Sequence, residues 1–313
     1  MKNVTRRISV VIPTHGRGTY LPSVLSALDR QTRRDFEVLV VDNNIRPVHS
    51  GLRADKRSWQ LSVIHEPRNG LQHARNAGVS ASRGAFIAFL DDDGVPASTW
   101  IEALVAGMER YDATAGGGTV RLKLLGPSPA WLGNEERALL SELRYQDRDI
   151  PRLPDDHYIA GANLCIRRKA FEELGLFDPA FDRTASSLRS SGELEYTRRL
   201  QEHGRTVSFI APACVEHQID VSRLSERYFY ARAYWQGRSD ALLETKWGRP
   251  ASFGRRNASE NVRALIGKAL SSMRNGTPQT RFQNRLRLLR EWGYCLQRFL
   301  LCSRISHLFV ASQ

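Results

Sequence analysis

The first third of the chain alternates between short apolar runs and stretches in which apolar residues recur every three or four positions. The apolar runs, which predict strands, lie at 8–12, 36–41, 61–65 and 86–90. The periodic stretches, which predict helices, lie at 20–31, 71–80 and about 97–111. This alternation is typical of the α/β class, with a mostly parallel sheet covered by helices on both faces.

Polar residues follow the first, second and fourth of these predicted strands. They are His15 and Arg17, then Asp42, then Asp91, Asp92 and Asp93. Ligands bind such sheets beyond the carboxyl ends of the strands, so we expect these side chains to line one crevice. There is no GxGxxG motif after the first strand and no GxxxxGK[ST] motif, which disfavours a dinucleotide dehydrogenase or a P-loop ATPase.

The three successive acids at 91–93 are poorly explained by folding, because neighbouring carboxylates repel one another. A divalent cation that bridges them to a phosphate would remove this repulsion. A solvated turn is the alternative, since Asp and Gly are ordinary turn residues.

Positive charge is concentrated toward the C-terminal end. The chain has a net charge of +13. Residues 248–313 hold 12 Lys or Arg and only two acids, Glu260 and Glu291. Apolar residues at helical spacing, interrupted by arginines, predict a basic amphipathic helix over 281–301. Such a helix suits an anionic membrane surface. A helix that packs on the rest of the chain, with a solvated basic face, is the alternative.

The chain has 313 residues, of which 41% are hydrophobic, and can bury a sizeable core. No apolar run reaches the roughly 18 residues that a membrane span needs. The polar start shows no signal peptide. The four cysteines are scattered and fit a reduced protein. We therefore expect a cytoplasmic protein, with peripheral attachment to the inner face of the membrane as an option for the basic tail.

A series of short motifs resembles the family 2 glycosyltransferases. The motifs lie, in order, at 9–14, 40–43, 69–78, 88–93, 160–163, 171–181, 192–195 and 215–217. Each is weak alone, but their order and spacing over about residues 8–240 are specific. The resemblance implies the GT-A fold, which is Rossmann-like, and an inverting enzyme that uses a nucleotide-sugar donor and a divalent cation.

The resemblance also implies a division of the chain. Residues 1–240 would form the GT-A catalytic domain, with the nucleotide sugar bound by about 8–120 and the acceptor side formed by 121–240. Residues 241–313 would form a basic helical C-terminal extension.

The acids at 91–93 resemble the family's DxD motif. By that match Asp93 ligates the metal, Asp91 lies against the ribose or the metal, and Asp92 belongs to the donor site. His217 stands where the fold commonly supplies a further ligand, and a hydrogen-bonded histidine at a strand end is the alternative. Mg²⁺ or Mn²⁺ fits these ligands better than Zn²⁺.

The match implies further donor contacts at Pro13, Thr14, His15, Arg17, Asp42 and Arg75. Asp42 would accept hydrogen bonds from the base or the ribose, and Arg75 would pair with the diphosphate. The family usually has Gly-Ser in the loop after this Asp, whereas Asn43-Asn44-Ile45 follows here. A UDP-sugar is favoured as the donor, with dTDP- and GDP-sugars as alternatives.

Inverting transfer needs a carboxylate near the attacking hydroxyl. The family usually places Glu-Asp before a helix, and the match puts Glu193 at the catalytic Asp and Gly192 at the preceding acid. A slip in register would make Glu195 the base instead. The alternative is an acidic first turn that only complements the helix dipole.

The acceptor side is implied at Gly161, Ala162 and Asn163. Trp131, in the irregular stretch 126–156, is a candidate platform for a sugar ring, and a partly buried Trp is the alternative. The expected acceptor is a carbohydrate or a lipid-linked intermediate in bacterial-type polysaccharide, lipopolysaccharide or glycoconjugate biosynthesis.

Three other functions remain open at this point. A nucleotidyltransferase shares the sheet and the acidic metal ligands, although the triphosphate loop expected near the first strand is incomplete. A non-catalytic relative would explain the altered base segment. A nucleic-acid-binding protein would explain the high isoelectric point, but the charge lies in one tail and no nucleic-acid module accompanies it, so we expect no nucleic-acid partner.

Overall fold

The computed structural model describes residues 8–52, 57–248, 267 and 276–310, and side chains up to 302. These residues form two compact units. The first comprises the described residues up to Leu125, together with Leu140–Ala185 and Gly192–Ile219. The second comprises Gly126–Leu139, Ser186–Ser191 and the described residues from Asp220 onward. A division into separately folding domains near residue 240 stays a prediction.

The first unit is built on a seven-stranded sheet in the order β3-β2-β1-β4-β8-β6-β9. Its strands are β1 (Ile8–Thr14), β2 (Phe36–Asp42), β3 (Gln60–His65), β4 (Phe86–Leu90), β6 (Ala115–Gly117), β8 (Asn163–Arg167) and β9 (Val207–Phe209). The four strands from β3 to β4 pair in parallel, and β8 runs antiparallel to both of its neighbours. The predicted α/β class and mostly parallel sheet are confirmed.

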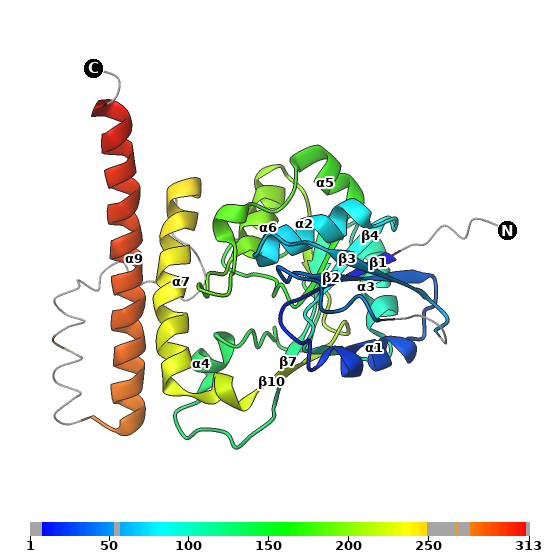
Figure 1. Cartoon of the computed structure of the whole chain (residues 1–313), viewed down its shortest axis with the longest axis horizontal. Coiled ribbons are helices and arrows are strands. Elements are labelled where there is room, and N and C mark those ends of the chain that lie inside the picture. Colours follow the sequence, from blue (N-terminus) through cyan, green and yellow to red (C-terminus); the bar gives the residue numbers. More distant parts are fainter. Residues whose placement is uncertain (1–7, 53–56, 249–266, 268–275, 311–313) are drawn as a thin grey trace. The chain divides into compact units, whose positions relative to one another are not determined.

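Helices cover both faces of this sheet (Figure 1). The helices α1 (Leu21–Asp29) and α3 (Trp100–Arg110) lie on one face. The helices α2 (Leu71–Ala81), α5 (Arg168–Leu174) and α6 (Gly192–Glu202) lie on the other. All three helices predicted in the first third of the chain are therefore present, within a few residues of their expected ends.

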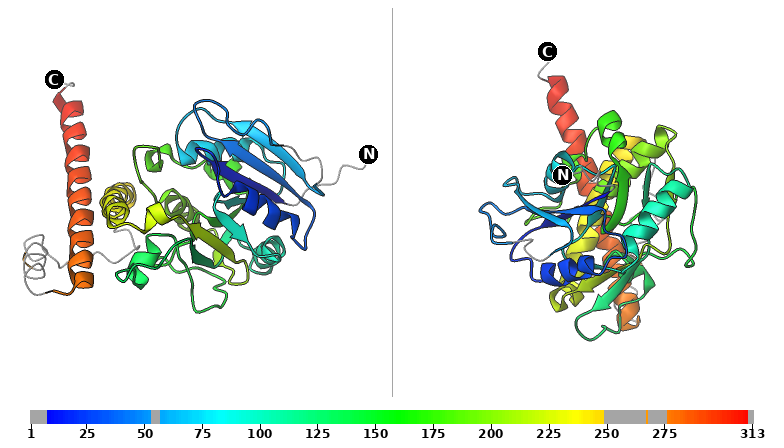
Figure 2. Two further views of the ribbon diagram at one scale, coloured as in Figure 1. Left: turned by 60° about the horizontal axis from the view of Figure 1, so that its bottom comes forward. Right: turned by 90° about the vertical axis from the view of Figure 1, so that its right-hand side faces the viewer.

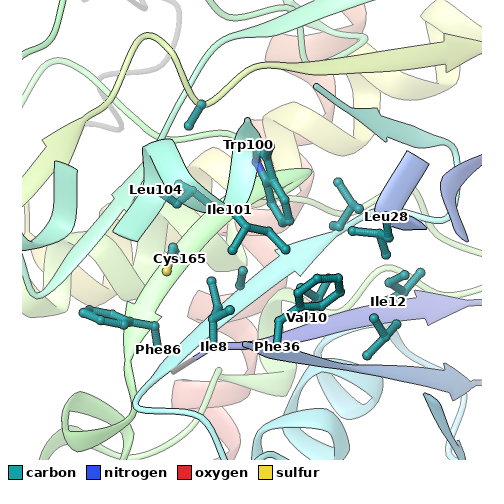
Figure 3. Packing of buried hydrophobic residues seen from close by; sticks show 14 of the residues in the cluster. Ile8, Val10, Ile12, Leu28, Phe36, Phe86, Trp100, Ile101, Leu104 and Cys165 are labelled. Carbon is teal, nitrogen blue, oxygen red and sulfur yellow. The ribbon is translucent and has the colours of Figure 1, made fainter. Parts of the chain in front are cut away.

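Burial explains why β1, β2 and β4 appear as unbroken apolar runs in the sequence. Every residue of these strands is buried, because side chains on both faces pack under helices. Figure 3 shows one face, where Ile8, Val10 and Ile12 of β1 lie against residues of α1 and α3, including Trp100. This packing fixes the carboxyl ends of the central strands, where the polar loops begin.

A second sheet of three strands stands beside the acids. Its strands are β5 (Gly94–Pro96), β10 (Val215–Ile219) and β7 (Val120–Leu124), in the order β5-β10-β7. The strand β5 begins directly after Asp93 and pairs antiparallel with β10, so that His217 lies opposite Gly94. This register carries a histidine from late in the chain to the acidic motif.

The second unit contains a pair of long helices, α7 (Glu226–Trp247) and α9 (Pro278–Val310), with the short elements α4 (Asn134–Ala138) and η2 (Val221–Leu224). Figures 1 and 2 show α7 next to α9. Glycines allow a close approach: a Cβ added at Gly237 would lie 1.8 Å from the Arg290 carbonyl oxygen, and one at Gly293 would lie 2.0 Å from that of Tyr234. The helices therefore touch backbone to backbone.

The helix predicted over 281–301 is confirmed as part of α9, but its expected apolar stripe is only partly buried. Phe282 and Leu286 are buried, together with Tyr294 and Gln297, whereas Leu300 is exposed. None of the helices that the structure describes is long and apolar enough to cross a membrane.

Candidate functional site

Two acids and a histidine converge where β4 ends and β5 pairs with β10. One ligand atom from each of Asp91, Asp93 and His217 lies within 4.8 Å of the others. The Gln218 N–H donates to the Asp93 carbonyl oxygen at 2.9 Å, which fixes β10 on the backbone of the acidic motif. The structure therefore brings together the three residues that the sequence assigned to a metal.

The hydrogen bonds of His217 suit a metal ligand. Its ring is almost completely buried, and Nδ1 lies 2.9 Å from the Leu140 carbonyl oxygen. A carbonyl only accepts, so Nδ1 carries a proton, and the neutral ring turns the lone pair of Nε2 toward Asp93. When no cation is bound, a proton on Nε2 would instead allow a hydrogen bond from His217 to Asp93.

The spacing of the same atoms also fits an octahedral cation. His217 Nε2 lies 3.0 Å from Asp93 Oδ1. Neighbouring ligands of an octahedral ion with bonds of about 2.1 Å lie about 3.0 Å apart. Two carboxylates and one imidazole match the preferences of Mn²⁺ or Mg²⁺.

Asp92 faces the end of β1. The Thr14 hydroxyl donates to Asp92 Oδ2 at 2.6 Å, which ties the first and fourth strands together at the crevice. Burial and the neighbouring charges of Asp93 and Asp91 raise the pKa of Asp92 to about 7, although the Thr14 hydrogen bond opposes this. A cation held by its neighbours would lower that pKa.

Two asparagines join the loops after the first three strands. Asn43 donates from its amide to the carbonyl oxygens of Glu66 and Arg68, both at 2.8 Å, and accepts from the Gly70 N–H at 2.9 Å. Asn44 accepts from the Gly16 N–H at 2.9 Å. The unusual Asn-Asn pair thus has a structural role that sequence reasoning missed.

Asp42 is fully buried, and the loop that follows it uses its carboxylate. Oδ2 accepts from the N–H groups of Val48 and His49 at 2.6 and 2.7 Å, and Oδ1 accepts from the side chain and the N–H of Asn44 at 2.7 and 3.3 Å. Burial alone would raise the pKa of Asp42, but these hydrogen bonds outweigh it and hold the pKa below its usual value. A carboxylate has about four acceptor sites. A contact from Asp42 to the donor would have to share them, and stays a prediction.

A cavity of about 350 Å³ lies beside Asp42. Its lining residues are Asp42, Pro47, Ser50, Leu52, Leu61, Val63 and His65. Its volume is at the lower end of the range for small-molecule sites.

The other residues expected near the donor divide into buried and exposed ones. Pro13 and Thr14 end β1 and are buried, whereas His15 and Arg17 are exposed in the loop that follows. His15 Nδ1 donates to the Asn43 carbonyl oxygen at 2.8 Å.

Arg75 lies between the metal-side acids and the candidate base. Its guanidinium is 2% exposed and donates to the Gly161 carbonyl oxygen at 3.2 Å. Nη2 lies 3.9 Å from Asp91 Oδ1, and Nη1 lies 3.6 Å from Glu193 Oε2. Among the described residues, its buried Nε and Nη1 have no hydrogen-bond partner, and Nη1 has only the ion pair with Glu193. A Cβ at Gly161 would lie 2.5 Å from Nη2, which explains the small residue there.

Glu193 and Glu195 have different surroundings in the first turn of α6. Glu193 is 20% exposed and approaches Arg75. Glu195 is completely buried and accepts from Arg199 at 2.5 and 3.2 Å, within the same helix. This geometry gives Glu195 a structural partner and leaves Glu193 able to reach a substrate.

Gly192, where the family usually has an acid, has no room for a side chain. A Cβ there would lie 2.4 Å from Nε2 of Gln72, whose side chain fills the space. Gln72 is almost fully buried, and its Oε1 has no hydrogen-bond partner among the described residues. The sequence shows that Gly192 replaces the family's usual acid, but the cause, which is the position of the Gln72 side chain, appears only in the structure.

Asp182 is another residue that sequence reasoning missed. Its Oδ1 accepts from the Gln72 N–H at 2.6 Å in the first turn of α2, and its Oδ2 lies 3.7 Å from His73 Nε2. Gly70 leaves the space for this carboxylate. Asp182 therefore holds the start of the helix that carries Arg75.

The residues expected on the acceptor side belong to both units. Gly161 and Ala162 are buried just before β8, and the Gly161 carbonyl oxygen accepts from Arg75. The amide of Asn163 is used by the protein itself, because it donates to Thr119 and Ala213 carbonyl oxygens and accepts from Trp100. Trp131 belongs to the second unit, where its ring packs against Phe229 and Phe282. Acceptor roles for these residues stay predictions.

Comparison with known proteins defines the class. Residues 9–175 match the family model "Glycosyl transferase family 2", and the chain belongs to this family. The chain is 29% identical over 251 residues to the pre-mycofactocin glycosyltransferase of Mycobacterium tuberculosis, a match that covers 77% of this chain and 48% of that protein. It is 25% identical over 253 residues to the succinoglycan biosynthesis protein ExoM of Rhizobium meliloti, covering 78% and 77%. The chain thus spans about half the length of the mycobacterial relative.

Solved structures support the fold. TarS 1–349 of S. aureus in complex with UDP-GlcNAc superposes with a TM-score of 0.51 at 14% identity, over 91% of each chain. GalNAc-T7 with UDP, GalNAc and Mn²⁺ gives 0.54 at 18% identity, over 89% of this chain and 59% of that one. The GT-A fold implied by the sequence is confirmed.

Proposed function

We propose that this chain is an inverting, metal-dependent glycosyltransferase that moves a sugar from a nucleotide-sugar donor to an acceptor hydroxyl. The observation that carries the proposal is the cluster of Asp91, Asp93 and His217 within 4.8 Å, with Arg75 between Asp91 and Glu193. Membership of the family supports the reaction class. A nucleotidyltransferase gains no comparable support.

Asp93 and His217 would hold the cation directly, and Asp91 would lie against the cation or the ribose. The bound Mn²⁺ or Mg²⁺ would supply Lewis-acid stabilisation of the negative charge on the leaving diphosphate. The Leu140 carbonyl keeps His217 in the tautomer that presents Nε2. Asp92 and Thr14 would fix the end of β1 against the donor.

Glu193 would act as the general base. In the single displacement, the acceptor oxygen forms a bond to the anomeric carbon as the bond to the diphosphate oxygen breaks, and the hydroxyl proton passes to Glu193. Arg75, whose Nη1 lies 3.6 Å from Glu193 Oε2, would orient this carboxylate. Its guanidinium would also donate hydrogen bonds to the phosphates of the donor.

The donor is proposed to be a UDP-sugar. TarS has been solved with UDP-GlcNAc, and GalNAc-T7 with UDP and GalNAc. The cavity of about 350 Å³ beside Asp42 is a candidate site for the nucleobase. For the acceptor we propose a carbohydrate or lipid-linked intermediate of polysaccharide or glycoconjugate biosynthesis, a role supported by the name of the Rhizobium relative.

We also propose a cytoplasmic location with peripheral membrane contact through α9. Trp292 and Phe299 are 65% and 68% exposed on this helix, and Arg281, Arg285 and Arg298 are exposed beside them. An aromatic and basic helix face is attracted to anionic headgroups. Binding to vesicles that contain phosphatidylglycerol should fall in Trp292→Ala/Phe299→Ala, and equal binding by this variant would exclude α9 as the contact.

Paired substitutions of the two glutamates test the base assignment. Glu193→Gln should lower metal-dependent release of nucleoside diphosphate by about a hundredfold or more, with unchanged melting temperature. Glu195→Gln should instead lower the melting temperature, because it breaks a buried pair with Arg199. Full turnover in Glu193→Gln, with loss in Glu195→Gln at a temperature where it is folded, would move the base to Glu195.

A further inference from the structure

The loop Ser186–Ser191 leads directly into α6, whose first turn carries Glu193, and this loop is hydrogen-bonded to α7. The Ser190 N–H donates to Ser239 Oγ at 3.1 Å, and Ser190 Oγ donates to Gln236 Oε1 at 3.0 Å. The other end of the Gln236 amide donates to Ser191 Oγ at 3.4 Å. Two side chains of α7 therefore hold the last two residues of the loop.

Further hydrogen bonds link Gln236 of α7 to α9 through Asp240. Gln236 Nε2 donates to Asp240 Oδ1 at 2.9 Å, and Arg290 of α9 donates to Asp240 Oδ2 from Nε and Nη2 at 2.8 and 2.7 Å. Gln236, Ser239 and Asp240 are all buried. Charge-assisted bonds in a buried network are strong and have defined geometry. One chain of hydrogen bonds thus runs from α9 through α7 to the loop.

The backbone of Ser191 shows why the loop needs this support. Ser191 has a φ of +75°, in the left-handed region that side chains other than glycine rarely adopt. Such a conformation persists only where its surroundings fix it. Ser191 immediately precedes Gly192, so this turn residue joins directly onto the first turn of α6, which carries Glu193.

We infer that Gln236 and Ser239 are positioning residues for the reaction: they hold Ser190 and Ser191 in the turn that leads into α6, and this turn sets the conformation of the first helical turn, which carries Glu193. The inference rests on the proposed function, because it takes Glu193 as the base. A base displaced by about 1 Å can lose on the order of a hundredfold in rate. Asp240 and Arg290 hold Gln236 in turn, so loss of the Arg290 pair should act through the same turn at Ser190 and Ser191.

The chain offers a matched control at the same helix pair. Gln297 of α9 accepts from Nε and Nη2 of Arg238 of α7 at 2.9 and 2.7 Å, and among the described residues neither of these side chains contacts the 186–191 loop. The test variants are Gln236→Leu, the milder Ser239→Ala, and Arg290→Met. The control is Gln297→Ala, which breaks a contact between the helices without touching the network.

Kinetics are measured with the UDP-sugar from which the wild-type chain releases UDP fastest in Mn²⁺, and UDP binding by calorimetry. Gln236→Leu should lower kcat at least about tenfold, and Ser239→Ala and Arg290→Met should lower it less, with donor KM and UDP affinity unchanged. Gln297→Ala should keep the wild-type kcat. Wild-type kcat in Gln236→Leu and Ser239→Ala, or an equal loss in Gln297→Ala, would overturn the inference.

Hydrogen exchange separates this inference from the proposed function. If the wild-type chain releases no UDP from any UDP-sugar, the proposed function fails, but the link between α7 and the loop is still measurable. Amides of 186–195 should exchange faster in Gln236→Leu and Ser239→Ala than in the wild type, and at the wild-type rate in Gln297→Ala. Unchanged exchange in both test variants would overturn the inference independently of activity.

Discussion

Gly192 and Gln72 share one small space beside the candidate base. A methyl group on residue 192 would lie 2.4 Å from the Gln72 amide nitrogen, so either residue limits the size of the other. Gly192→Ala should therefore lower the free energy of unfolding by about 1–3 kcal/mol. Gln72→Ala should remove most of that loss, because the methyl group then has room. Urea denaturation of the two single variants and the double variant gives the coupling energy, expected at about 1 kcal/mol or more.

Gly51→Ala is the matched control for this cycle, since no atom lies within 4 Å of the added methyl group. It should be close to neutral and uncoupled to Gln72→Ala. Additive losses for Gly192 and Gln72 would show that the two residues do not compete for the same space.

Some residues of the site can be recognised from their neighbours in the sequence, whereas others can be recognised only in the folded chain. Asp91 and Asp93 stand out because three acids after a buried strand are poorly explained by folding, and His217 followed from the resemblance. The structure brings these three together. Gln72 and Asp182 carried no such signal, because their roles depend on what other parts of the fold place against them.

Asp42 organises the loop after β2, and its ionisation contributes to stability. Its pKa is lowered in the folded chain, so this contribution is present above the unfolded pKa near about 3.9 and is lost as the pH falls through the lower folded value. Asp42→Asn places an amide where the N–H groups of Val48 and His49 need acceptors. It should lower the free energy of unfolding at pH 7 by about 2 kcal/mol or more.

Urea denaturation at pH 7 and pH 3 checks this prediction. The difference between the wild type and Asp42→Asn should shrink at pH 3, because there the Asp42 carboxylate is mostly protonated in the unfolded chain. Glu216→Gln, which alters an exposed pair with Lys123, should change stability little at either pH. A difference for Asp42→Asn that is equal at both pH values would contradict the assigned role of its charge.

At the scale of elements, the sequence predicts best what is locally periodic. The strands β1, β2 and β4 and the helices α1 to α3 follow from unbroken apolar runs and helical spacing. The short strands β5, β6 and β9 have three residues each, too few to show a period. The pairing of β5 with β10, which brings His217 to Asp93, depends on contacts between distant parts of the chain. Backbone contact at Gly237 and Gly293 likewise appears only when α7 and α9 meet.

At the scale of the whole molecule, the acidic candidate metal site and the basic helix α9 belong to different units. The acids, Arg75, Glu193 and His217 belong to the first unit, and the described arginines of α9 belong to the second. The family model matches residues 9–175, which include the acids but neither candidate base nor His217. Donor binding and catalysis by this chain therefore have to be tested on its own residues.

The central claim is that Asp91, Asp93 and His217 bind a divalent cation together with the diphosphate of the donor. Calorimetric titration of the full chain with UDP, with and without Mn²⁺, tests it most directly. UDP should bind in Mn²⁺ and lose at least about tenfold in affinity when the cation is chelated, and Asp93→Asn should show the same loss with Mn²⁺ present. Glu193→Gln should bind UDP as the wild type does. Equal UDP affinity with and without Mn²⁺, or wild-type affinity in Asp93→Asn, would contradict the claim.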